Sequence, residues 1–206
     1  MAFTHLHVHT EYSLLDGSNK IKEYVRRVKE LGMDSAAITD HGVMYGVIDF
    51  YKACRAEGIR PILGCEVYVA PNSRFDKELT GGDDRYYHLV LLAENNTGYN
   101  NLTRIVSRGF TEGYYYKPRV DMELLQEFHE GIIALSACLA GEVQRYITKG
   151  LYDEAKKTAL KYQACFGKGN YFLELQDHGL PEQKMVNTAL LQMSKELDIP
   201  LVATKD

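Results

Sequence analysis

Three histidines occupy alternate positions near the amino terminus, in the segment His5-Leu6-His7-Val8-His9. Alternate side chains of an extended strand share one face, so neighbouring imidazoles would lie about 7 Å apart and point the same way. An exposed polar face on an edge strand, or the remnant of an expression tag, is the alternative. A tag would be an uninterrupted histidine run, whereas apolar residues alternate with these histidines. The pattern favours metal ligation by His7 and His9, while His5 has no strong case of its own.

An acid and an imidazole follow the next apolar run, in the phrase Thr39-Asp40-His41-Gly42. Carboxylate and imidazole are common ligands for zinc, manganese and iron. A lone Asp–His pair is more often part of a turn, but the alternating histidines favour the ligand interpretation for His41. Asp16 precedes Gly17, and for this residue an Asp–Gly turn and a ligand both stay open.

Two more polar side chains are embedded in apolar runs, Glu66 within 62–69 and His88 within 86–92. Burying a carboxylate is costly unless a cation or hydrogen bonds compensate for the lost water. Either residue alone would more often be a satisfied polar group of the core. Together with the histidines they predict one polar focus inside an apolar fold.

Cys138 ends the run Ser136-Ala137-Cys138, where its thiolate would be either a soft metal ligand or a nucleophile. The four cysteines stand far apart with no CxxC pair, which excludes a zinc ribbon and makes a disulfide framework improbable. The aromatic run 114–119, Tyr-Tyr-Tyr-Lys-Pro-Arg, is compatible with base stacking and phosphate pairing. Such a run more commonly anchors a loop or an interdomain contact.

Short apolar runs alternate with amphipathic helical segments, and these elements must position the polar residues. Strands are expected at Phe3–His9, Ser35–Thr39, Arg60–Val69, Tyr86–Ala93, Gly131–Ser136, Tyr171–Leu175 and Pro200–Thr204. Helices are expected at Ile21–Leu31, Val47–Cys54, Gly98–Arg108, Met122–Glu127, Glu142–Lys149, Tyr152–Phe166 and Glu182–Leu197, the first two ending near Gly32 and Gly58. This alternation predicts an α/β fold with a mostly parallel sheet.

The polar residues fall at or near the carboxyl ends of many strands, which is typical of the active face of a barrel. An open doubly wound sheet would concentrate them at one switch point. Neither the GxGxxG nor the GxxxxGK[ST] phosphate-binding loop occurs in the sequence. We therefore expect a TIM-like barrel of seven strands.

Length and composition bound the other properties of the chain. Its 206 residues are 45% hydrophobic and 25% charged, as expected for one globular domain spanning residues 1–206. The net charge of −4 lacks the basic excess of a domain that grips duplex DNA unaided, so bound cations or a neighbouring domain would have to contribute. No apolar run is long enough to cross a membrane and no secretory signal is recognisable, so a cytoplasmic protein without a membrane partner is expected.

Five longer phrases carry a family resemblance: HLHVHTEYSLLDG, ITDHGVMYG, ILGCEVYVA, LSACLAGEV and YFLELQDHGLPEQ. The sequence resembles the polymerase and histidinol phosphatase (PHP) superfamily, and in particular the amino-terminal PHP domains of the alpha subunits of bacterial DNA polymerase III. The resemblance runs from residue 3 to the last residue. It implies a distorted seven-stranded barrel with a metal cluster at the carboxyl-terminal mouth of the strands.

The resemblance also implies up to three divalent ions, which would be zinc, manganese or iron. The implied ligands are His7, His9, Glu66 and Asp206 for one ion, with Glu66 bridging to a second ion on His88 and Cys138, and Asp16 with His41 for a third. No catalytic side chain is assigned, and His9 and Asp16 are the candidates nearest the reacting water. The final motif of the family reads Asp-x-His, whereas the sequence stops at Asp206, so a truncated chain and a weakened third site are expected.

The function implied by the resemblance is a metal-dependent phosphoesterase that acts as a 3′–5′ exonuclease within a replicative DNA polymerase. The carboxylates for nucleotidyl transfer would lie outside this chain, and DNA would be bound through the full polymerase. One alternative is a metal-stabilised scaffold that docks other polymerase domains or a proofreading exonuclease subunit. A free-standing phosphoesterase of the histidinol phosphatase type is the other alternative.

Overall fold

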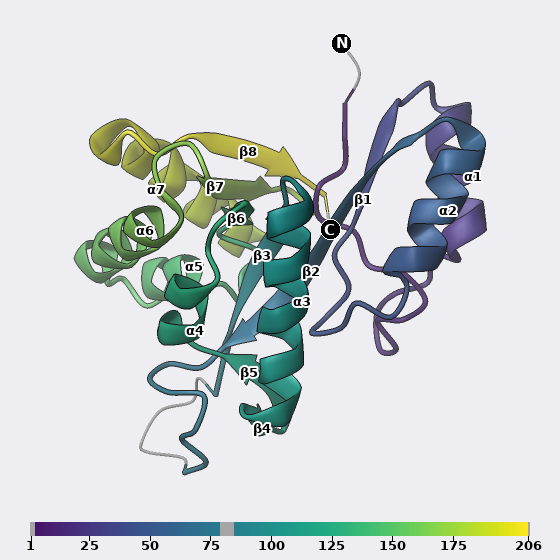
Figure 1. Ribbon diagram of the computed structural model, residues 1–206. Coiled ribbons are helices and arrows are strands. Elements are labelled where there is room, and N and C mark those ends of the chain that lie inside the picture. The colour runs from purple at the N-terminus through teal and green to yellow at the C-terminus, as the bar shows by residue number, and fades with distance from the viewer. Residues whose placement is uncertain (1–2, 79–84, 206) are drawn as a thin grey trace.

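A curled sheet forms the centre of the computed structural model, which describes residues 3–78 and 85–205 (Figure 1). Its strands are β1 Ser35–Ile38, β2 Arg60–Val69, β3 Tyr87–Ala93, β4 Tyr114–Tyr115, β5 Lys117–Val120, β6 Ile132–Leu135, β7 Tyr171–Gln176 and β8 Leu201–Thr204. The helices are α1 Ile21–Glu30, α2 Val47–Glu57, α3 Asn96–Thr111, α4 Met122–Glu127, α5 Glu142–Thr148, α6 Tyr152–Phe166 and α7 Pro181–Leu197. The α/β class and the curled sheet confirm the expectation from the sequence.

The strand order β1-β2-β3-β6-β7-β8 is parallel at every pair except the two that involve β3. β3 runs antiparallel to both of its neighbours, with His88 opposite Tyr68 near the end of β2. The first residues of β3 therefore lie at the end of the sheet where the parallel strands finish. This reversal brings an amino-terminal strand position to the carboxyl-terminal mouth.

The expected first strand, Phe3–His9, is wrong: no ladder forms along this segment. The segment runs beside β1, where the Val8 carbonyl accepts a bond from the Thr39 amide (2.9 Å) and the Val8 amide donates to the Thr39 hydroxyl (2.8 Å). A side-chain hydroxyl thus replaces a backbone carbonyl as the partner, which interrupts the ladder. The extended course at the edge of β1 is nevertheless retained, as Figure 1 shows.

Helices cover the outside of the sheet, and apolar side chains fill both of its faces. α1 and α2 pack on β1 through a cluster centred on Val25, Ile38 and Phe50. The other helices cover β2, β3, β6 and β7 through a larger cluster that includes Leu102, Leu124, Tyr162, Tyr171 and Leu190. Inside the curl, Val90, Leu92, Leu135 and Ala137 form a third cluster, against which Leu6, Ile62, Ile133, Phe172 and Val202 pack.

Local sequence signals end or begin several helices near the expected positions. α2 stops where Gly58 adopts a left-handed conformation with φ of 72°. The side chains of Asn95 and Asp121 accept the free amides of Gly98 and Leu124 at the starts of α3 and α4. In the part of the chain that the structure describes, no helix combines the length and apolar character needed to cross a lipid bilayer.

The aromatic run 114–119 forms the short hairpin β4–β5 rather than a loop. β5 extends the sheet beside the last residues of β2, with Tyr68 opposite Arg119. Tyr116 is the single residue between the two hairpin strands, because Tyr115 pairs with Lys117. Its φ of 61° lies in the left-handed region that bulky side chains avoid.

Candidate metal centre

Both oxygens of one fully buried carboxylate, Glu66 on β2, are surrounded by imidazole nitrogens. Its Oε1 lies 3.3 Å from His7 Nε2 and 3.0 Å from His88 Nδ1. Its Oε2 lies 3.4 Å from His9 Nε2 and 2.6 Å from His41 Nδ1. The structure therefore brings together the four histidines that the sequence analysis placed around Glu66. With Cys138, described below, we call this group the Glu66 cluster.

Separate elements deliver these side chains to Glu66. His7 and His9 come from the amino-terminal segment, which the Val8–Thr39 bonds fix to the end of β1. His41 lies just beyond β1, and His88 is the second residue of the antiparallel strand β3. The polar focus therefore lies at the carboxyl-terminal end of the parallel strands.

Asp40 organises the loop around the cluster. Its buried carboxylate accepts the Thr10 amide (2.6 Å), the Thr10 hydroxyl (2.7 Å) and the Ser13 hydroxyl (2.8 Å). The Ser13 hydroxyl in turn accepts the His41 amide at 3.1 Å. Asp40 thus joins the segment that carries His9 to the loop that carries His41.

Gly42 fixes the loop after His41 against β2. Its amide donates to the Glu66 carbonyl at 2.8 Å, and its φ of 65° is left-handed. A Cβ atom at this position would lie 2.8 Å from Tyr68 Cε2 and 3.0 Å from Pro118 Cγ. The absence of a side chain therefore permits Tyr68 and the hairpin to pack directly beside the His41 loop.

We predict that Gly42→Ala lowers the free energy of unfolding more than Gly58→Ala. Both positions are left-handed, which costs an alanine about 1–2 kcal/mol. A Cβ at Gly58 would have open space around it, whereas at Gly42 it meets Tyr68 and adds an overpacking cost of about 1–3 kcal/mol. Urea denaturation of both variants measures the difference, and equal losses would contradict the close packing at Gly42.

Glu174 is a residue whose role the sequence analysis missed. This buried carboxylate on β7 lies with its Oε1 2.7 Å from His7 Nδ1 and also accepts the Thr204 hydroxyl. A carboxylate that accepts a hydrogen bond from one imidazole nitrogen fixes the tautomer and orients the ring, so that the other nitrogen can bind a metal ion. Here the other nitrogen, His7 Nε2, faces Glu66. The only sequence signal was the position of Glu174 near the end of an apolar run.

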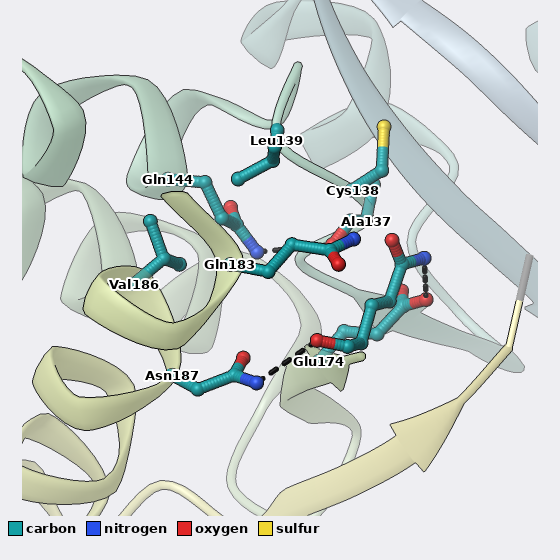
Figure 2. Close-up of a pocket in the computed structure, with 9 residues that line it drawn as sticks. Ala137, Cys138, Leu139, Gln144, Glu174, Gln183, Val186 and Asn187 are labelled. Atoms are coloured by element: carbon teal, nitrogen blue, oxygen red, sulfur yellow. Dashed lines mark hydrogen bonds between the residues drawn. The ribbon is translucent and has the colours of Figure 1, made fainter. Parts of the chain in front are cut away.

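Cys138 reaches the cluster from the loop after β6. Its Sγ lies 3.6 Å from His88 Nδ1 and 3.8 Å from Glu66 Oε1. Ala137 before it is left-handed, with φ of 64°, and its carbonyl accepts a 3.0 Å bond from the buried Gln144 side chain. Figure 2 shows Gln144 in a small pocket behind this loop, with the Cys138 sulfur pointing away from the pocket. The left-handed backbone at Ala137 thus directs the Cys138 thiol toward His88.

The other expected site residues differ in their placement. The Asp16 carboxylate lies 2.8 Å from His41 Nε2 and is 54% exposed, so it forms the solvent side of the cluster. Asp206 lies outside the described residues. His5 packs its ring edge-on against Phe3 and takes no part in the contacts that the structure describes around Glu66.

Burial and charge act in opposite directions on these groups. Burial by itself raises the pKa of Glu66, but the adjacent His7, His41 and His88 outweigh it and hold that pKa well below its usual range. Burial lowers the pKa of His7, but Glu174 and Glu66 raise it well above the ordinary value. The pKa of His41 is raised in the same way. The cluster therefore stabilises positive charge next to Glu66, and an ion that binds there must displace protons.

The donor set fits divalent metal ions. Two groups offer ligand atoms that all lie within 4.8 Å of one another, namely His7, His9 and Glu66, and His41, Glu66 and His88. Atoms that share one ion at bonds of about 2.0–2.2 Å are at most about 4.4 Å apart. His41 Nδ1 and Glu66 Oε2 are both buried and lie 2.6 Å apart. This contact brings a nitrogen donor and an oxygen donor together at one point of the cluster.

Comparisons with known proteins show the family of the chain. A family model for the PHP domain matches residues 5–178. The DNA polymerase III subunit alpha of Treponema pallidum is 52% identical over 206 residues, which are 100% of this chain and 18% of that protein. The subunit alpha of Deinococcus radiodurans is 49% identical over 99% of this chain and 16% of its own length. The chain thus spans less than a fifth of these relatives.

Two solved structures share the fold at low sequence identity. An amidohydrolase from Chromobacterium violaceum has a TM-score of 0.60 at 14% identity and covers 100% of this chain and 87% of its own. A two-domain protein from Bacteroides vulgatus, which contains a predicted PHP-like metal-dependent phosphoesterase, has a TM-score of 0.58 at 16% identity. It covers 98% of this chain and 51% of its own. At such identity these likenesses show the fold.

Proposed function

Because the chain belongs to the PHP domain family, we propose that the Glu66 cluster binds divalent metal ions and hydrolyses phosphoesters, with the 3′ end of DNA as its substrate. The observation that carries the proposal is the convergence of four imidazoles and a thiol on both oxygens of one buried carboxylate. An isolated anion in such a place would be costly. Metal ligation accounts for the residue types, their burial and their number together.

We propose two bound ions. His7, His9 and Glu66 would hold one, and His41, Glu66 and His88, with Cys138 beside them, would hold the other. This grouping differs from the family resemblance, which assigned His41 and Asp16 to a third ion, since His41 Nδ1 lies directly on Glu66. We propose zinc, manganese or iron as the metal. Bound divalent ions supply a nucleophile at neutral pH and offset the charge of phosphoryl oxygens.

The side chains around the ligands have roles of their own. Glu174 orients His7, and the full burial of Glu66 keeps water from its carboxylate. The Asp16 carboxylate lies 2.8 Å from His41 Nε2 at the exposed rim, and there it would accept a proton during the reaction. His9 stacks on His41 with ring centroids 4.0 Å apart, which holds both imidazoles in place.

Space for a substrate lies next to the cluster. A groove with a volume of about 520 Å³ is lined by Cys138, Leu139, His178, Leu180 and Gln183, among others. Pockets for small ligands usually have volumes of about 300–1,000 Å³. The volume of the groove is within this range, and Cys138 is the residue that it shares with the Glu66 cluster.

The relatives named as DNA polymerase III subunit alpha support a wider context. We propose that this domain works within a bacterial replicative polymerase in the cytoplasm, whose other domains supply polymerisation and bring DNA to the cluster. Docking of a separate proofreading exonuclease subunit is a further part of this proposal. The metal site would serve hydrolysis of the strand that the polymerase extends.

A structural role for the metal is the second candidate. Segments far apart in the sequence, such as those that carry His7 and Cys138, meet at Glu66. Bound ions would therefore cross-link these segments. Metal binding that is coupled to folding stabilises the folded state. In this case the ions would bind and raise stability without any hydrolysis.

One experiment separates the two candidates. Metal content and release of nucleotides from a 3′-labelled single strand are measured for the chain, for His88→Ala and for the control His129→Ala. His129 is exposed and bonds to the Gln126 carbonyl. We expect hydrolysis by the chain and by the control, and a loss of about 100-fold or more in His88→Ala, as for removal of a group that stabilises developing charge. If the unmodified chain holds its full content of metal but none of the three proteins hydrolyses the strand, the structural role is established instead.

A further inference from the structure

The hairpin β4–β5 lies directly beside the Glu66 cluster. β5 pairs with the end of β2, and both Tyr68 and Pro118 of the hairpin lie close to Gly42, the residue after His41. The Tyr68 ring lies with its centroid 6.1 Å from that of His41 and 5.3 Å from that of His88. One aromatic side chain therefore separates the hairpin from two of the candidate ligands.

Two cationic side chains lie over aromatic rings at and near the hairpin. Lys117 Nζ lies 5.4 Å from the centroid of the Tyr68 ring, and the Arg85 guanidinium lies 4.4 Å from the centroid of the Tyr116 ring. We call Arg85, Tyr116 and Lys117 the hairpin surface, while Tyr68, over whose ring Lys117 lies, is buried. It presents two cations and an exposed aromatic ring, in a chain whose net charge is −4.

The two cations have no acidic partner in the part of the chain that the structure describes: no carboxylate oxygen of a described residue lies within 4 Å of Lys117 Nζ or of the Arg85 guanidinium. Arg74 and Arg108, in contrast, each contact carboxylates at 2.6 to 3.4 Å. Internal ion pairing therefore does not account for Lys117 and Arg85. As far as the described residues are concerned, their positive charge is available to an anionic ligand.

Tyr116 is held in an unfavourable conformation without being buried. Its φ of 61° costs of order 1–3 kcal/mol for a bulky residue, which glycine would not incur. The side chain remains 59% exposed, so packing in the core does not explain why an aromatic ring stands here. A ring that is exposed at a strained position is placed to contact a ligand.

We infer that the hairpin surface binds the single-stranded DNA that enters the Glu66 cluster, with Lys117 and Arg85 pairing with phosphates and Tyr116 stacking on a base. This inference rests on the proposed function and identifies how the strand is held. Aromatic rings interleaved with cations are the usual means of binding single strands. A duplex would hide its base faces from Tyr116, and its charge density calls for a larger basic surface than this chain has.

The test measures binding of a fluorescein-labelled oligo(dT) of about 12 nucleotides, a length within the site sizes of single-strand binders. Fluorescence anisotropy is recorded with the whole 206-residue chain in a chelator, so that no hydrolysis occurs. The variants are Tyr116→Gly and Lys117→Ala. Lys157→Ala is the matched control, because Lys157 is an exposed lysine on α6 whose partner is Glu154.

We expect Tyr116→Gly to bind about tenfold more weakly, equivalent to about 1.4 kcal/mol, with a melting temperature no lower than that of the parent chain. A residue with a merely structural role would lower the melting temperature instead. Lys117→Ala should bind more weakly and reduce the slope of log K against log salt by about 0.7, the loss of one phosphate contact on a single strand. Lys157→Ala should bind as the parent chain does.

No binding by the parent chain, or variants that bind as tightly as Lys157→Ala, would overturn the inference. Failure of the proposed function is recognised separately with bis(4-nitrophenyl) phosphate, a diester that lacks the neighbouring nucleotides that Tyr116 and Lys117 would contact. Hydrolysis of this diester by the metal-loaded chain without oligonucleotide binding would leave the proposed function intact and refute the inference. Oligonucleotide binding that depends on Tyr116 and Lys117, without diester hydrolysis, would do the reverse.

Discussion

Glu66→Gln is expected to abolish the stabilisation that divalent metal gives to the folded chain. An ion that binds only the folded state adds about 2.7 kcal/mol to its stability at a concentration one hundred times the Kd. Both groups of candidate ligands share Glu66, so one substitution removes a charged oxygen from each. The variant should therefore melt at nearly the same temperature with and without metal, whereas the parent chain should be stabilised strongly.

The effect of the same substitution in chelator should be smaller. Without metal, the charge of Glu66 is compensated by histidines, since its pKa is held low and that of His7 is raised. A neutral amide removes this attraction, but it also removes the cost of burying a carboxylate, and the two changes oppose each other. We expect a modest change of stability in chelator and a large one with metal.

Glu142→Gln is the matched control for this prediction. Glu142 is also a buried glutamate, but its carboxylate contacts Lys161 and Tyr162 on the outer side of the sheet. Its substitution should lower the melting temperature equally in metal and in chelator. Thermal denaturation of both variants under both conditions decides the matter. Equal shifts for Glu66→Gln in the two buffers would show that Glu66 is no metal ligand.

Glu174→Gln is expected to weaken metal binding about 10- to 100-fold, the usual effect of removing a carboxylate that orients a ligating histidine. Glu174 Oε1 lies 2.7 Å from His7 Nδ1, and this contact directs His7 Nε2 at Glu66. The amide has nearly the same size, so the core around β7 should be preserved. The loss should therefore appear in affinity and not in the fold.

Competition with a chromophoric chelator measures this affinity, and Glu142→Gln again serves as the control, because it leaves His7 untouched. The circular dichroism spectrum of Glu174→Gln should match that of the parent chain. An unchanged affinity, within about twofold, would mean that His7 either does not bind metal or does not need Glu174 to orient it.

The sequence predicted the convergence at Glu66 better than it predicted the backbone that produces it. Residue types alone indicated the polar focus, because a carboxylate in an apolar strand needs compensation wherever the strand lies. The conformation of the segment Phe3–His9 could not be predicted in this way. The alternation of residues does not reveal that the Thr39 hydroxyl, in place of a backbone carbonyl, accepts the Val8 amide. The imidazoles of His7 and His9 still reach Glu66 from an extended chain without a ladder.

The position of His88 relative to the other candidate ligands depends on the direction of its strand. His88 is the second residue of β3, and in a fully parallel sheet that position would lie at the opposite end from the other candidate ligands. The antiparallel course of β3 reverses this, and hydrophobic periodicity gives no information on strand direction. Glu174 was missed for a related reason, because its contact with His7 joins positions 167 residues apart in the sequence.

The hairpin β4–β5 was not predicted from the sequence because its strands are short. Two strands of two and four residues with a single residue between them leave no alternation to detect. The left-handed backbone at Tyr116 contradicts its residue type, so local propensity argues against the turn that forms. Local rules fail most often where function or strain overrides them.

The most direct test of a metal site at Glu66 is an anomalous difference map from crystals of the zinc-loaded chain, recorded at the zinc absorption edge. A peak about 2.0–2.2 Å from His7 Nε2 and from a Glu66 carboxylate oxygen is the expected result, with a second peak next to His41 Nδ1 and His88 Nδ1. A map from fully loaded crystals with no peak within bonding distance of Glu66 would contradict the account.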